Sequence, residues 1–159
     1  MEIFLGEVYT ERVMYDVLTI GTATRDVFLT GKGFKVLRDK EHLQKIGFPT
    51  GEAECFALGA KIEVEEPVFT GGGGAANAAV TFARQGLKTA AVFKIGADND
   101  GCEIVERLRA EHIVPIAMKD RKVGTGCSTI LLTPQGERTI LVYRGATEKI
   151  AEKDLSLSK

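Results

Sequence analysis

Four glycines run directly into a series of small residues in Gly71-Gly72-Gly73-Gly74-Ala75-Ala76-Asn77-Ala78-Ala79. Glycine carries no Cβ, so such a loop lets backbone N–H groups come close to a bound polar molecule. The alanines that follow favour a helix, and a helix N-terminus attracts negative or strongly hydrogen-bonding groups. This stretch therefore predicts a loop-to-helix junction at which a polar ligand binds.

Asn77 favours a ligand contact over a purely structural role for these glycines. Glycines can also serve simply to bring a helix close to its neighbours. An amide in an alanine-rich first turn is a poor helix former, however, and it offers both a donor and an acceptor to a ligand. We therefore expect Asn77 to contact the bound molecule.

The segments on both sides of the junction alternate between strand and helix patterns. Apolar runs typical of buried strands occupy residues 15–20 and 89–95, and apolar residues recur at helical spacing over 76–87 and 100–112. Asp100 is predicted to cap the second helix. Strand, helix and strand in this order predict an α/β domain with a parallel sheet.

Shorter β-like segments are predicted outside this core. Residues 26–30 and 34–37 flank a glycine-rich turn and predict a hairpin. Residues 54–68 alternate apolar with charged side chains, as in a strand with one wet face. Residues 128–144 predict a second hairpin around the turn Pro-Gln-Gly-Glu. The interval 38–51 has no clear pattern, so no element is assigned to it.

The polar residues 147–159 follow the second hairpin and are expected to be helical. An α/β pattern would continue with another strand at this point. The predicted sheet is therefore incomplete at its C-terminal end.

The composition is that of an ordinary soluble domain. Of 159 residues, 44% are hydrophobic and 27% charged, and 21 basic against 22 acidic side chains leave a net charge of −1. No block of one sign predicts a nucleic-acid or membrane surface, and no stretch approaches the ~20 apolar residues of a membrane-spanning helix. We expect a cytoplasmic protein that binds neither nucleic acids nor membranes.

The cysteine and histidine patterns do not predict a metal site. No C-x-x-C pair occurs among Cys55, Cys102 and Cys127, and neither His42 nor His112 has a ligand partner at i+4. We expect this chain to bind no metal ion.

A dinucleotide-binding fingerprint, G-x-G-x-x-A, is formally present at Gly71, Gly73 and Ala76. In a true fingerprint this motif follows a buried strand, and an acidic residue stands at the end of the next strand. Here the preceding segment is charged and the next strand ends without an acidic residue. A Rossmann-type NAD(P)-binding protein is therefore a distant alternative.

The glycine junction resembles the first signature of the ribokinase-like (PfkB) carbohydrate and nucleoside kinases. The resemblance lies in residues 73–79 and in the distances from them to Gly86 and Gly96. Residues 96–101 are similar to the G-x-D-x-x-G segment that continues this signature. Glycines and an amide at these fixed intervals make the likeness specific.

Two further segments resemble the same family. Residues 21–26 are similar to its first strand and loop, in which an aspartate binds substrate hydroxyls. Residues 124–146 resemble its later pair of strands. The likeness extends over about residues 15–146, which is most of the chain.

The resemblance implies an α/β fold with a ribokinase-like three-layer αβα core, incomplete at the C-terminus, and a small β-sheet lid. Residues 1–159 would form the N-terminal part of one kinase domain. The lid strands are expected within residues 26–37, 55–68 and 113–118.

The resemblance also implies a sugar site. Asp26 would accept hydrogen bonds from sugar hydroxyls, and Asn77 would hold a further hydroxyl. The backbone of Gly72, Gly73 and Gly74 would line the pocket. From the residues alone, Asp26 also suits a turn after a strand, where aspartate is common, and it is the family resemblance that favours the contact role. Some family members carry Lys or another polar residue where this chain has Gly74, which leaves the identity of the sugar open.

The implied function is that of the substrate-binding half of an ATP-dependent kinase, which transfers the γ-phosphoryl group to a sugar or nucleoside hydroxyl. The family's second signature, a D-T-x-G-A-G-D segment with the catalytic base and nucleotide site, does not occur in these 159 residues. We therefore expect no catalytic residue here. ATP and Mg²⁺ would bind to the C-terminal half of the full-length parent, and this chain alone would be inactive.

Two expectations concern partners. The lid is expected to offer a surface for a homodimer, and the missing C-terminal half is itself an expected partner. A catalytically silent sugar-binding or interaction module is the main alternative function. The gene sequence after Lys159 distinguishes them, because an in-frame G-A-G-D segment supports the kinase and a stop codon supports the module.

Overall fold

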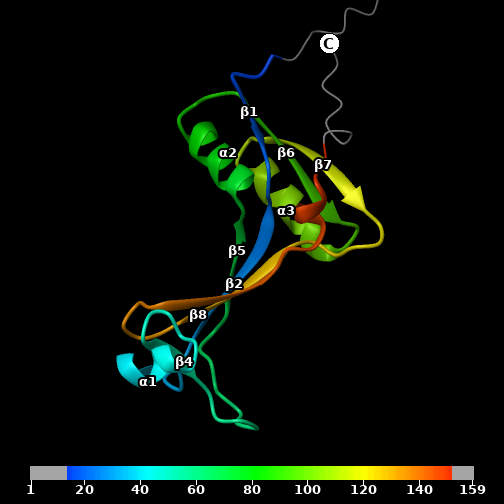
Figure 1. Ribbon diagram of the computed structural model, residues 1–159. Helices are drawn as coiled ribbons and strands as arrows, with labels where there is room; N and C mark the ends of the chain where they lie inside the picture. The colour runs from blue at the N-terminus through cyan, green and yellow to red at the C-terminus, as the bar shows by residue number, and fades with distance from the viewer. Residues whose placement is uncertain (1–13, 152–159) are drawn as a thin grey trace, which may run out of the picture.

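Two sheets of different kinds organise residues 14–151, the part of the chain that the computed structural model describes. The parallel sheet has the order β1-β6-β7, formed by Val17–Ile20, Thr89–Gly96 and Val114–Asp120. The mixed sheet has the order β5-β2-β8-β9, formed by Val68–Gly72, Thr24–Thr30, Cys127–Leu132 and Arg138–Tyr143. Figure 1 shows the mixed sheet extending away from the parallel sheet and its helices.

A small third unit lies at the far end of the mixed sheet (Figure 1). There β3 (Lys35–Arg38) pairs antiparallel with β4 (Glu52–Cys55), and α1 (Lys40–Lys45) lies between them in the chain. The Asp39 carboxylate caps α1 by accepting from the His42 N–H at 3.0 Å. The sequence pattern predicts no element over residues 38–51, so α1 is found only in the structure.

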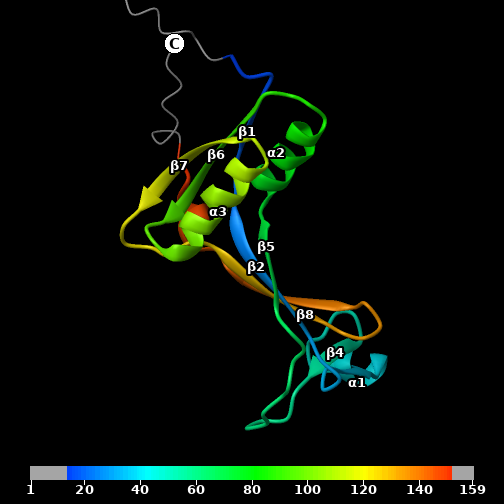
Figure 2. The ribbon, with the colours of Figure 1, turned by 180° about the vertical axis from the view of Figure 1, so that it is seen from behind.

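The main core lies between the parallel sheet and two helices, α2 (Gly74–Arg84) and α3 (Asn99–Ala110). Figure 2 shows the two helices side by side on one face of this sheet. Phe93 and Ile95 of β6 are fully buried against Ala79 of α2 and Ile104 and Leu108 of α3. The small residues of α2 allow close approach to the sheet, and this packing confirms the predicted order of strand, helix and strand.

The other face of the parallel sheet is apolar, and in the described part of the chain residues 145–149 cover only part of it, along β6. The strand register aligns Leu18 with Ala90 and Val114, and in the next row it aligns Ile20 with Val92 and Ile116. The four outer side chains of these two rows are 40–45% exposed. One helical layer of an αβα sandwich is thus present, together with a sheet face that a second layer would cover.

The prediction of a hairpin over residues 26–37 is wrong. β2 lies between β5 and β8 in the mixed sheet, and β3 pairs with β4 instead. The glycine-rich turn forms, with the Phe34 N–H donating to the Gly31 carbonyl at 3.2 Å. The seven residues of β2 nevertheless pair on both sides with strands that are distant in sequence, and this non-local pairing outweighs the local turn signal.

The prediction of a strand over residues 54–68 is also wrong, because β4 ends at Cys55 and β5 begins only at Val68. Residues 56–67 form no strand. Leu58 is fully exposed and Val64 is 42% exposed, so the alternating pattern has no buried face to occupy. The lid strand expected within 113–118 belongs instead to β7, which pairs parallel with β6.

Three remaining expectations concern the hairpin, the helix cap and the tail. The hairpin of β8 and β9 is confirmed. Asp98, not Asp100, is the N-cap of α3, because its Oδ1 accepts from the Gly101 N–H at 2.9 Å. The tail begins with a 3-10 segment, η1 (Gly145–Lys149), and residues 152–159 lie outside the described residues.

Asp98 also ties the start of α3 to the loop before β8. Its Oδ2 accepts from the Thr125 N–H at 2.8 Å, and its Oδ1 accepts from the Thr125 hydroxyl at 2.5 Å. The Thr125 Oγ1 in turn accepts from the Gly96 N–H at the end of β6, at 2.9 Å. Thr125 is only 4% exposed, so this network is a buried junction between the two sheets.

Acid is expected to weaken this junction. Burial alone raises the pKa of the Asp98 carboxyl, but the hydrogen bonds from Thr125 and Gly101 outweigh burial and hold the pKa below its usual range. The ionised carboxylate therefore contributes stability that is fully present above about pH 4 and is lost as pH falls through the lower folded pKa. We expect the urea midpoint of the wild type to fall more below about pH 4 than that of Asp98→Asn. Parallel pH profiles for the two proteins would contradict this expectation.

Candidate functional site

The Asp26 carboxylate lies directly over the backbone of Gly72. β2 and β5 run antiparallel, with Thr24 opposite Gly72 and Asp26 opposite Thr70. A Cβ added at Gly72 would lie 2.1 Å from Asp26 Oδ2 and 2.8 Å from Thr24 Oγ1, so only glycine leaves room for both side chains. The Thr24 hydroxyl also donates to Asp26 Oδ1 at 3.0 Å. The structure therefore brings the predicted carboxylate and the glycine loop together.

Gly73 makes the turn from β5 into α2. Its backbone has φ +94°, and a Cβ there would lie 2.5 Å from the Thr22 carbonyl oxygen. A side chain at Gly74 would by contrast meet only the Thr22 hydroxyl, at 3.8 Å. The two neighbouring glycines thus differ: the first is required by the turn, and the second leaves open space.

Thr22 satisfies the first N–H groups of α2, a role that the sequence analysis missed. Its hydroxyl accepts from the Gly74 N–H at 2.9 Å, and its carbonyl accepts from the Ala75 N–H at 3.0 Å. Caps are usually found by local spacing, but Thr22 lies in the loop after β1, far from α2 in sequence. The helix N-terminus therefore presents fewer free donors to a ligand than the glycine motif suggested.

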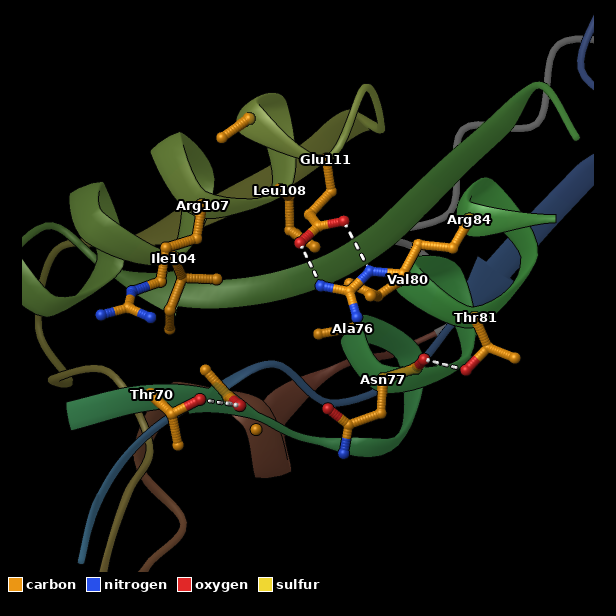
Figure 3. Close-up of a pocket in the computed structure, with 13 residues that line it drawn as sticks. Thr70, Ala76, Asn77, Val80, Thr81, Arg84, Ile104, Arg107, Leu108 and Glu111 are labelled. Atoms are coloured by element: carbon orange, nitrogen blue, oxygen red, sulfur yellow. Dashed lines mark hydrogen bonds and ion pairs between the residues drawn. The ribbon is translucent and has the colours of Figure 1, made fainter. Parts of the chain in front are cut away.

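Asn77 lines a cavity of about 570 Å³ between β5, α2 and α3. Figure 3 shows its amide beside β5, while Ile104 and Leu108 of α3 lie across the cavity. Within the described residues the side-chain amide has no hydrogen-bond partner. Only the backbone of Asn77 is used: its N–H donates to the Gly73 carbonyl at 2.9 Å, and its carbonyl accepts from the Thr81 hydroxyl at 2.9 Å. Asn77 is therefore available to a ligand.

The predicted site residues do not all border this cavity. Gly72 and Asn77 line it, whereas Asp26, Gly73 and Gly74 do not. Gly72 is the link, because it borders the cavity and also lies against the Asp26 carboxylate. The structure thus joins Asp26 to the glycines and the glycines to Asn77 without placing Asp26 and Asn77 on one cavity wall.

Charged residues that the sequence analysis did not single out close one end of the cavity. Arg84 of α2 donates to both oxygens of Glu111, from Nε at 2.9 Å and from Nη2 at 2.6 Å (Figure 3). Hydrogen bonding to Arg84 holds the pKa of Glu111 below its usual range. No spacing rule predicts this pair, since Arg84 is the last residue of α2 and Glu111 follows the end of α3.

The glycine loop does not have the setting of a dinucleotide fingerprint. That motif follows a parallel strand, whereas β5 is antiparallel to β2 in the mixed sheet. Within residues 14–151, no group of three or more His, Cys, Asp or Glu side chains has an arrangement that would hold a metal ion. None of the described helices combines the length and apolar character needed to cross a membrane.

Residues 45–159 match the pfkB family of carbohydrate kinases. The ribokinase of Mus musculus is 34% identical over 85 residues, which is 53% of this chain and 26% of the relative. The ribokinase of Staphylococcus aureus is 33% identical over 103 residues, which is 64% of this chain and 34% of the relative.

A solved structure shows the same fold. The ribokinase from Cryptococcus neoformans in complex with ADP superposes with a TM-score of 0.62 at 22% identity, over 89% of this chain and 37% of that protein. The chain therefore spans about a quarter to two fifths of the length of these relatives.

Proposed function

Because this chain belongs to the pfkB family of carbohydrate kinases, we propose that it forms the substrate-binding half of an ATP-dependent sugar or nucleoside kinase. The observation that carries this proposal is the Asp26 carboxylate lying over Gly72, next to the start of α2. A carboxylate accepts hydrogen bonds from sugar hydroxyls, and a backbone without side chains lets a sugar ring come close. Charge-assisted hydrogen bonds of this kind are stronger than neutral ones.

Each site residue has a distinct role in this proposal. Asp26 accepts from hydroxyls, the backbone of Gly72, Gly73 and Gly74 lines the site, and the Asn77 amide binds a further hydroxyl. Gly72 lies against the Asp26 carboxylate and also lines the cavity that Asn77 lines, so in this proposal a sugar bound at this glycine contacts Asp26 on one side and the Asn77 amide on the other. One carboxylate and one amide then fix the orientation of a ligand whose hydroxyls both donate and accept.

We assign the role of the lid to the mixed sheet together with the β3–β4 unit. A cover over the sugar excludes water from the phosphoryl group during transfer. The edge strand β9 supports a second role as a homodimer surface. Its residues Leu141, Val142 and Tyr143 are 52–58% exposed, which is unusual for adjacent apolar side chains.

The nucleotide site, Mg²⁺ and the catalytic base are assigned to a part of the kinase outside these 159 residues. The described residues contain no cluster suited to a metal ion, and the sequence has no G-x-x-x-x-G-K-[ST] phosphate loop. We therefore derive no chemical step for this chain and propose that it is inactive alone. The uncovered apolar face of the parallel sheet, with Leu18 and Ile116 at its borders, is the surface on which the remaining layer would pack.

Removal of either polar side chain is expected to weaken sugar binding. Asp26→Ala and Asn77→Ala should each reduce the affinity for D-ribose by about 1–3 kcal/mol, because hydrogen bonds are lost or left unpaired. Isothermal titration of this chain with D-ribose, and with other sugars and nucleosides, measures the change. Gln85→Ala, at the opposite end of α2, is the matched control and should bind as the wild type does. Unchanged affinity in both site variants would refute the assignment.

A catalytically silent sugar-binding module would contain the same site. Phosphorylation separates the two functions, because a full-length kinase that carries these residues forms a sugar phosphate from MgATP and a binding module does not. Loss of phosphorylation with Asp26→Ala would connect that activity to the site described above.

A further inference from the structure

We propose that Arg25 is a positioning residue that holds the Asp26 carboxylate in place over Gly72. Arg25 and Asp26 are neighbours on β2, so their side chains project to opposite faces of the mixed sheet. Asp26 faces the proposed sugar, and Arg25 faces α3. The proposal rests on the proposed function, since it assigns a support to the same sugar-binding carboxylate.

The Arg25 guanidinium is held between two elements. It forms an ion pair with Glu103 of α3, and it lies 4.9 Å from the centre of the Phe69 ring of β5. Its side chain is only 14% exposed, whereas that of Glu103 is 51% exposed. A cation that is largely removed from water and placed over an aromatic face contributes more than an exposed pair does. This contact therefore joins β2, β5 and α3.

A second arginine, Arg107, also joins α3 to β5. Arg107 of α3 donates from Nη2 to the Phe69 carbonyl at 3.2 Å, and its side chain lies against Gly71. The Arg25 guanidinium thus lies over the ring of Phe69, and Arg107 donates a hydrogen bond to its backbone carbonyl. Because Gly71 and Gly72 follow on the same strand, the two arginines fix the part of β5 that carries the sugar-facing glycine.

The position of Asp26 depends on the registry that these contacts hold. The carboxylate lies in space that a Cβ at Gly72 would fill, so a small shift of β2 against β5 changes its distance from the glycine backbone. No other ion pair joins β2 to α3 among the described residues. Arg25 and Glu103 are therefore the specific link between the helix and the sugar-facing strand.

The test compares Glu103→Gln and Arg25→Met with Glu106→Gln in the full chain. Glu106 is a matched control, because it is also on α3 and pairs with Arg109 at 2.7 Å but does not reach the mixed sheet. Two-dimensional ¹H–¹⁵N NMR reports on the backbone amides of Asp26 and Gly72, and titration with D-ribose gives the affinity. We expect both test variants to shift these two amides and to weaken ribose binding about threefold to tenfold, as coupled neighbours do.

The double variant Arg25→Glu with Glu103→Arg restores an ion pair and should return the Gly72 amide toward its wild-type position. Unshifted Asp26 and Gly72 amides in folded Glu103→Gln would overturn the positioning role, and so would equal shifts in Glu106→Gln. Shifted amides in a chain whose wild type binds no ribose would uphold the positioning role and refute the proposed sugar site.

Discussion

Gly73→Ala is expected to lower the free energy of unfolding by about 3 kcal/mol, because the new Cβ causes both backbone strain and a steric clash. The backbone at Gly73 has φ +94°, which L-residues rarely adopt. The new Cβ would also lie 2.5 Å from the Thr22 carbonyl oxygen and 2.7 Å from Ala23 Cα, both part of the loop between β1 and β2. That loop cannot yield without losing the bonds by which Thr22 caps α2.

The neighbouring Gly74→Ala is the matched control for this prediction. Gly74 is the first residue of α2, and a Cβ there would meet nothing nearer than the Thr22 hydroxyl at 3.8 Å. Alanine has a higher helix propensity than glycine, so this variant should be neutral or more stable by up to about 1 kcal/mol. Urea unfolding followed by circular dichroism measures both. Similar destabilisation by the two substitutions would contradict the structural distinction between them.

Asp98→Ala is expected to cost about 2–3 kcal/mol of stability. The substitution removes an N-cap from α3 and leaves the Thr125 N–H without its acceptor inside a buried junction. Because this junction joins β6, α3 and the loop before β8, the loss should also loosen the connection between the two sheets. Hydrogen exchange at the Thr125 and Gly101 amides should become faster, and thermal unfolding should start at a lower temperature.

Asp100→Ala serves as the control for the Asp98 substitution. Asp100 lies in the first turn of α3, and no hydrogen bond of its side chain is formed with another described residue. Its negative charge near the helix N-terminus is favourable by a small amount, so the variant should lose no more than about 1 kcal/mol. Equal losses of stability in Asp98→Ala and Asp100→Ala would show that the junction with Thr125 contributes little to the stability of the fold.

The parallel core was predictable because its signals are local. The apolar run of β6 and the helical periodicity of α2 and α3 each arise within a dozen residues, and burying such a pattern requires no particular partner. The hairpin of β8 and β9 was predictable for a similar reason, since its turn residues specify how the chain reverses.

The mixed sheet was not predictable in the same way. β2 looks like the first strand of a hairpin, yet its partners are β5 and β8, which lie far away along the chain. Alternation over residues 61–65 looks like a strand, yet no neighbouring strand supplies the ladder that would stabilise it. Strand pairing depends on cross-strand contacts, so a single segment holds too little information to choose its partner.

The amino-acid sequence by itself determined that this chain carries a glycine loop before a small-residue helix, with Asp26 and Asn77 as its polar candidates. Tertiary structure alone decided that Asp26 lies over Gly72 and that Thr22 accepts hydrogen bonds from the first N–H groups of α2. It also decided that Arg25 pairs with Glu103 and lies over the ring of Phe69. The physical reason is that residue types and local periodicity are properties of short segments, which the sequence shows directly. Contacts between β2, β5 and α3 exist only after strands distant in sequence have paired and packed.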